Sequence, residues 1–142
     1  MSRADPPGEA RAVTLLHTIL TGSLVVIVLA MSMVVWLRGG PLLEPDRFAA
    51  LVAYISTGIA LTIVAIAVAV IRAQLPETGR SGSDYWNPGT RKLALLLWIM
   101  CENGGTLAAV GYILTGHLAP LIGAAIAVLT MVWYSPRRIS GA

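Results

Sequence analysis

An acidic residue interrupts a long apolar stretch in the C-terminal half of the chain. Glu102 lies within WIMCENGGTLAAVG, residues 98 to 111. If a membrane helix begins near Leu93, a rise of about 1.5 Å per residue places Glu102 about 13–14 Å into a hydrocarbon core of about 30 Å. An ionised carboxylate is costly at that depth, so we expect Glu102 to be protonated, paired or in contact with water. Glu102 is therefore a candidate functional residue.

The polar neighbours of Glu102 are suited to holding a proton or a cation. On a helix, Thr106 follows Glu102 by one turn and Trp98 precedes it by one turn, while Asn103 is adjacent. Thr106 and Asn103 could form hydrogen bonds with the carboxyl group, and Trp98 could cover it and offer its indole N–H. We predict an ion-binding site of Glu102, Thr106, Asn103 and Trp98 that exchanges a proton or cation.

Small residues form a second pattern on the same predicted helix. Glycine and alanine at helical spacing let a second backbone approach closely, which is how many membrane helices associate. The sequence therefore predicts a helix-packing surface made of Cys101, Gly104, Gly105, Ala108 and Ala109. Glu102 would lie beside this contact.

Two other interpretations of Glu102 stay open at this point. A protonated carboxyl group can hydrogen-bond a neighbouring helix and do no more than fix the packing. It can also contact a bound ligand. The sequence does not discriminate between these roles and ion exchange.

His17 is the second residue whose side chain could take part in proton transfer. It lies in the first apolar stretch, and Thr21 follows one helical turn later. One hypothesis is a proton relay in which His17 and Thr21 pass protons from the cytoplasm toward Glu102. The other is an interfacial histidine whose ring is satisfied by lipid headgroups or water. No other histidine lies within a predicted span, so a haem site is not expected.

The composition indicates a membrane protein. Of the 142 residues, 56% are hydrophobic and 12% are charged, and the mean hydropathy is +0.77. The net charge of +3 comes from basic residues that flank apolar stretches, so nucleic-acid binding is not expected. Cys101 is the sole cysteine, which excludes an intramolecular disulfide. The known motifs of phosphate-binding loops, metalloproteases and hydrolases do not occur, so we expect neither an enzyme nor a metal or cofactor site.

The hydropathy pattern predicts an all-α fold with one domain over residues 1–142. Apolar stretches of membrane-crossing length or close to it predict four transmembrane helices, at about residues 12–37, 48–71, 93–115 and 118–134. A polar connector rich in proline and glycine, residues 72–92, separates the first pair from the second. We therefore expect two tandem hairpins, and Tyr85 and Trp86 in the connector are expected at the headgroup level.

The distribution of basic residues predicts the orientation in the membrane. Eight of the ten lysines and arginines fall in the two tails and the middle connector, and two fall in the other connections. Cytoplasmic segments carry this excess, so both termini and residues 72–92 are predicted to be cytoplasmic. We expect a multi-pass protein of a bacterial-type inner membrane. The eight residues are Arg3, Arg11, Arg72, Arg80, Arg91, Lys92, Arg137 and Arg138.

The segment CENGGTLAAVG resembles the ion-binding helix of the rotor-ring proteolipids, the c-type subunits of rotary ATPases. In that family a mid-helix carboxylate is followed by small residues, as Glu102 is followed here by Gly104, Gly105, Ala108, Ala109 and Gly111. The resemblance implies that Glu102 is the proton or sodium carboxylate of a homo-oligomeric ring. The segment covers 11 of the 142 residues. The glycine repeat of the family is missing from the other helices, and the family's carboxylate lies on the second helix of a hairpin, not the first.

Three hypotheses follow for function. The first is a small oligomeric membrane protein whose Glu102 reversibly binds a proton or cation in ion translocation. The second is a non-catalytic accessory subunit of a larger membrane complex, with the small-residue faces and the loop SDYWNPG, residues 83–89, as docking surfaces. The third is a binder of lipid or of a small ligand.

Overall fold

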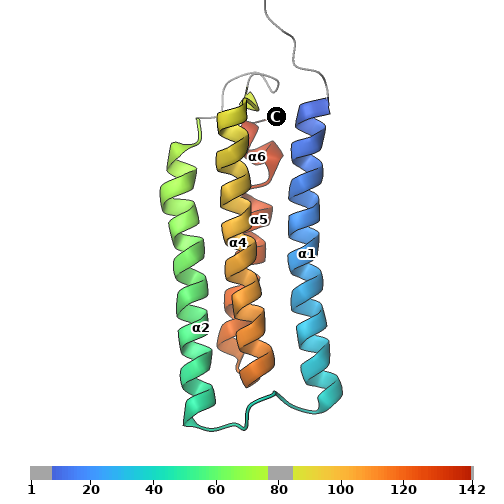
Figure 1. Ribbon diagram of the computed structural model, residues 1–142, viewed down its shortest axis with the longest axis vertical. Coiled ribbons are helices and arrows are strands. Elements are labelled where there is room, and N and C mark those ends of the chain that lie inside the picture. The colour runs from blue at the N-terminus through green and yellow to red at the C-terminus, as the bar shows by residue number, and fades with distance from the viewer. Residues whose placement is uncertain (1–7, 77–84, 142) are drawn as a thin grey trace, which may run out of the picture.

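The computed structural model describes residues 8–76 and 85–141, and these form an all-α bundle whose long helices lie side by side (Figure 1). The expected all-α fold class is confirmed. Residues 1–7 of the predicted tail and residues 77–84 of the predicted connector lie outside the described part. The described elements are α1 (Gly8–Arg38), α2 (Arg47–Ile66), its π-helical continuation η1 (Ala67–Arg72), α4 (Pro88–Thr115), α5 (Leu118–Trp133) and the short α6 (Pro136–Ser140).

Three helical segments are long and apolar enough to cross a membrane: Ala10–Arg38, Arg47–Arg72 and Pro88–Thr115. The fourth apolar helix, α5, has 16 residues, or about 24 Å at 1.5 Å per residue, against a hydrocarbon core of about 30 Å. These features fit a multi-pass membrane protein. They support three candidate crossings and a shorter apolar helix, so a fourth complete crossing stays a prediction.

The helix ends explain where the predicted spans were too short. We expected the third span to begin at residue 93, but α4 begins at Pro88. Asn87 caps it, because its side-chain oxygen accepts a hydrogen bond from the Thr90 backbone N–H at 3.0 Å. Pro88 suits the first helical position, where its missing N–H costs nothing. The polar residues before Leu93 therefore form the first helical turns of α4.

Helix α4 is the centre of the bundle. It packs against α1, α2 and α5, and it lies between α1 and α2, which barely touch (Figure 1). The connector from α1 to α2 passes the end of α4, where the Leu42 and Leu43 N–H groups donate to the carbonyls of Ile113 and Leu114 at 3.0 and 2.8 Å. The connector therefore holds α1 and α2 on opposite sides of α4, so the first of the two expected tandem hairpins is not a packed pair of helices.

The small-residue face of α4 makes this arrangement possible. Gly104 faces α2, where an added Cβ would lie 3.0 Å from the Ala60 carbonyl oxygen. Gly105 faces α1 and α5, where a Cβ would lie 2.8 Å from the Leu24 methyl groups and 3.0 Å from the Ala127 Cβ. Cys101, Ala108 and Ala109 are also buried. All five residues predicted to form the packing surface thus lie inside the bundle.

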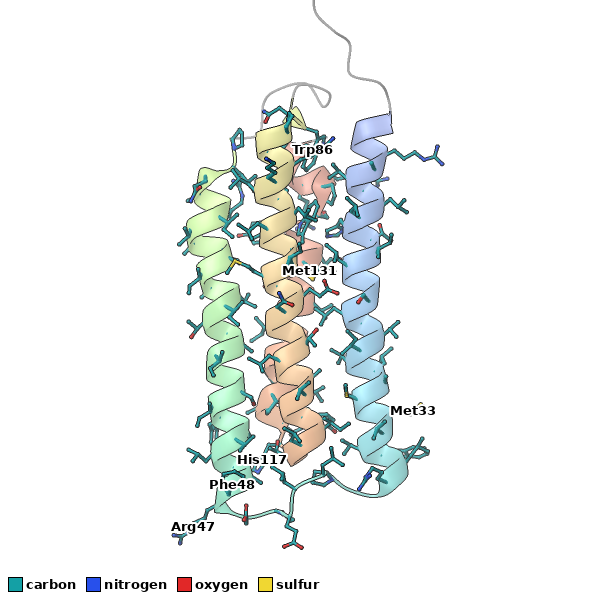
Figure 2. The ribbon with its side chains drawn as sticks, in the orientation of Figure 1. Met33, Arg47, Phe48, Trp86, His117 and Met131 are labelled. Atoms are coloured by element: carbon teal, nitrogen blue, oxygen red, sulfur yellow. The ribbon has the colours of Figure 1, made fainter. Side chains whose placement is uncertain are left out.

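Tyr85 and Trp86 pack inside the bundle at the end where α4 begins. Both side chains are buried, with Trp86 near the start of α4 (Figure 2). Their rings meet edge to face at 5.1 Å, and the Tyr85 hydroxyl donates to the Pro76 carbonyl at 3.2 Å. Burial raises the pKa of the Tyr85 phenol, partly opposed by the positive charge of Arg72. The two rings therefore pack against their own chain. Their expected depth, at the level of the lipid headgroups, stays a prediction.

A glycine comparison tests the close packing on α4. A Cβ at Gly111 would collide with the Ser56 hydroxyl and lie 2.9 Å from the Ser56 Cβ, whereas a Cβ at Gly58 would meet nothing within 4 Å. We expect Gly111→Ala to destabilise the fold by about 1–3 kcal/mol through overpacking. Gly58→Ala should leave stability unchanged or slightly higher. Unfolding of the detergent-solubilised protein measures both, and equal stability of the two variants would contradict this packing.

Candidate functional site

The Glu102 carboxyl group is bonded across the interface between α1 and α4. The Ser23 hydroxyl donates a hydrogen bond of 2.8 Å to Glu102 Oε1. Ser23 is the central residue of α1, and Glu102 lies at the centre of α4. The Glu102 side chain is half-buried. A carboxyl group and its hydroxyl partner therefore lie at the middle depth of two parallel helices.

Packing beside this pair determines its register. Leu24, the residue after Ser23, is fully buried, and its methyl groups fill the space that the missing Cβ of Gly105 leaves. Gly105 follows Glu102 by one helical turn, so it lies on nearly the same side of α4. The contact between Leu24 and Gly105 thus aligns Ser23 with Glu102.

Ser23 is the functional residue that sequence reasoning missed. Ser23 lies two residues beyond Thr21, which the relay hypothesis names. Two other hydroxyl residues of α1, Thr14 and Thr18, are exposed and bond their own helix. Their hydroxyl groups donate to the carbonyls of Ala10 and Thr14 at 3.0 and 2.8 Å. The Ser23 hydroxyl differs in bonding a residue of another helix. The sequence does not show which hydroxyl groups bond their own helix and which bond a neighbouring one.

The three predicted partners of Glu102 lie elsewhere. Asn103 is exposed and Thr106 is half-buried, and within the described chain neither side chain hydrogen-bonds Glu102. Trp98 is buried, and its indole N–H donates to the Tyr134 carbonyl at 2.8 Å. The expected indole bond to Glu102 is therefore wrong, because the ring turns toward the end of α5.

His17 and Trp98 together cap the C-terminal end of α5. The last carbonyls of a helix have no partner within it. His17 Nε2 lies 2.9 Å from the Met131 carbonyl oxygen, and Trp98 bonds the carbonyl of Tyr134. A carbonyl only accepts, so His17 Nε2 carries the hydrogen. The two rings meet edge to face at 4.8 Å, and Met131 lies well inside the bundle (Figure 2).

The surroundings of His17 differ from those expected of an interfacial histidine. The ring is 8% exposed and bonded to protein, so headgroups and water are not what satisfies it. Thr21 Oγ1 lies 3.4 Å from His17 Nε2. Ser23 follows His17 by six residues along α1, which is about 9 Å. Between the two pairs, the described residues provide no connecting hydrogen bond. The relay to Glu102 stays a prediction.

The donor set at Glu102 limits what the site can hold. Residues 8–76 and 85–141 contain no group of three or more histidine, cysteine or acidic side chains that could hold a metal ion. One carboxyl group with one hydroxyl partner can take up and release a proton. A hard cation needs about six oxygen ligands, which Glu102 and Ser23 do not supply.

Comparison with protein-family models, with curated proteins and with solved structures finds no match to this chain. The resemblance of residues 101–111 to the rotor-ring proteolipids therefore stays a prediction.

Removing one cap tests the account of α5. Trp98→Phe keeps a ring but leaves the Tyr134 carbonyl without its donor, so we expect a loss of about 1–3 kcal/mol in unfolding free energy. Trp36→Phe is the matched control, since Trp36 is 78% exposed. Chemical unfolding in detergent measures both. Equal stability of the two variants would show that the indole bond contributes nothing to the end of α5.

Proposed function

We propose that this chain is a small homo-oligomeric membrane protein in which Glu102 reversibly binds a proton as a step in ion translocation. The hydrogen bond between Ser23 and Glu102, at the centres of α1 and α4, carries the proposal. A carboxyl group at this depth is costly to ionise, and a hydroxyl donor lowers that cost. Glu102 is also half-buried, so part of the residue faces outward from the interface between α1 and α4.

The proposed ion is a proton and not a metal cation. A single carboxyl group with one serine hydroxyl suits a proton, whereas a metal ion would require further ligands from outside the described chain. The Ser23 hydroxyl can donate to a carboxylate or to the carbonyl oxygen of the neutral acid. The same hydrogen bond therefore supports both protonation states.

The proposal includes four crossings with both termini in the cytoplasm. The start of α1, the start of α4 and α6 lie at one end of the bundle (Figure 1). Within residues 8–76 and 85–141, six basic residues lie at or near this end of the bundle. The other two, Arg38 and Arg47, lie at the opposite end, where α1 ends and α2 begins. This asymmetry supports a cytoplasmic location for the first end. The six are Arg11, Arg72, Arg91, Lys92, Arg137 and Arg138.

Asn103 supports self-association. Its side chain is exposed next to Glu102 at the middle of α4, and within the described residues its amide has no hydrogen bond. An amide is costly in hydrocarbon unless it is bonded. It is also self-complementary, since it both donates and accepts, so the same residue of a second copy can pair with it. This polar face fits another copy of the chain.

The accessory-subunit hypothesis loses one of its supports. It used the aromatic residues of the middle connector as a docking surface. Tyr85 and Trp86 are 1% and 4% exposed. These rings are consequently not available to a partner protein unless the end of the bundle opens.

Infrared difference spectroscopy between low and high pH tests the proton site. Wild type should show the C=O stretch of a titrating buried carboxylic acid, and Glu102→Gln should lose it. Glu44→Gln is the matched control, since Glu44 lies exposed in the connector from α1 to α2. Ser23→Ala should shift the band, because it removes the hydroxyl donor. A band that persists in folded Glu102→Gln would refute the proposal.

The translocation step has a separate test. Proteoliposomes of wild type and of Glu44→Gln should pass protons under an applied membrane potential, and Glu102→Gln should lose most of this flux. A Glu102→Gln protein that assembles and conducts like wild type would exclude Glu102 from translocation.

Native mass spectrometry tests the proposed self-association. Asn103→Leu should shift the assembly toward the monomer, because the amide pair across the interface is lost. Thr62→Leu is the control, since Thr62 is an exposed residue of α2 whose hydroxyl bonds its own helix. An unchanged assembly mass for Asn103→Leu would place the interface elsewhere.

A further inference from the structure

A groove of about 270 Å³ lies between the first turns of α1 and the N-terminal part of α4. Its position is separate from the pair of Ser23 and Glu102, and neither residue lines it. Eight residues line the groove: Ala12, Val13, Leu16, Pro88, Arg91, Lys92, Leu95 and Trp98.

The inner part of the groove is apolar. Leu16 and Leu95 form its walls, and Trp98 lies at its far end. From Pro88 to Trp98 the groove follows α4 for about 15 Å, at 1.5 Å per residue. It is therefore long enough for part of a hydrocarbon chain.

The end of the groove near the start of α4 is positively charged. Arg91 and Lys92 line it, and Lys92 is exposed. The first turn of α4 contains no acidic residue, so the positive end of the helix dipole adds to these charges. A negatively charged group is consequently favoured at this place.

We propose that the groove binds one anionic phospholipid. The phosphate lies against the exposed Lys92, and an acyl chain follows Leu16 and Leu95 toward Trp98. Basic residues beside an apolar groove at the end of membrane helices are suited to anionic headgroups. A neutral lipid lacks the charge, and a soluble phosphate leaves the apolar part of the groove empty. The bound lipid links α1 to α4 and does not depend on the function of Glu102.

Lipid titrations of the delipidated protein in detergent test this site. Native mass spectrometry should show one retained dioleoyl phosphatidylglycerol, and no comparable retention of dioleoyl phosphatidylcholine. The anionic lipid should also raise the midpoint of thermal unfolding, whereas glycerol phosphate should not. Lys92→Gln should weaken binding of the anionic lipid about fivefold, as expected for one charge at a membrane surface. Arg137→Gln, the same loss of charge on the exposed surface of α6, should not weaken it.

A steric variant tests the groove without changing charge. Ala12 is exposed at the groove wall, so Ala12→Phe should fill the groove and abolish lipid retention in a protein that still folds. Ala30→Phe, at an exposed position of the same helix outside the groove, should retain the lipid. Equal retention of the two phospholipids by wild type, or undiminished retention by folded Ala12→Phe, would overturn the proposal. An equal effect of glycerol phosphate would reduce the site to a surface anion site and would also overturn it.

Discussion

The close approach of three helices to the small residues of α4 is the constraint on which this structure depends. Gly104 admits α2 and Gly105 admits α1 and α5, because a Cβ at either glycine would lie at most 3.0 Å from the nearest atom of a neighbouring helix. In a membrane, helices gain little from the hydrophobic effect when they associate, so close van der Waals packing has to hold them together. The same contacts align α1 with α4, and this alignment brings Ser23 to Glu102.

Because α5 is short, its last carbonyl groups need hydrogen-bond donors from other helices. His17 and Trp98, which the sequence suggested as functional residues, supply these donors. A helix of 16 residues ends before α1 and α4 do, and its last carbonyls have no partner within the helix. His17 and Trp98 bond the carbonyls of Met131 and Tyr134. His17 and Trp98 thus bond the end of α5, whereas Glu102 bonds Ser23. The proposed proton site is consequently simple: one carboxyl group and one hydroxyl.

The interface between α1 and α4 therefore joins the two proposed sites. It holds the carboxyl group at mid-depth and the lipid groove near the start of both helices. α1 is the least buried of the three candidate spans, with 6% of its most apolar window buried against 44% for α4. Because so little of α1 is buried, a lipid between α1 and α4, or a second copy beside them, would cover surface that the chain itself leaves exposed.

Hydropathy and turn residues determined much of the architecture from the sequence alone. The helical segments and the five small packing residues follow from patterns that act within one helix or one turn. Glu102 also stood out, since an acid in an apolar stretch needs no tertiary information to be noticed. Its partner did not, because the relative shift of two helices depends on how Leu24 fits against Gly105. The position of α4 between α1 and α2, and the pairing of His17 with the end of α5, were likewise decided by tertiary structure, because backbone groups find their partners only once the helices have packed.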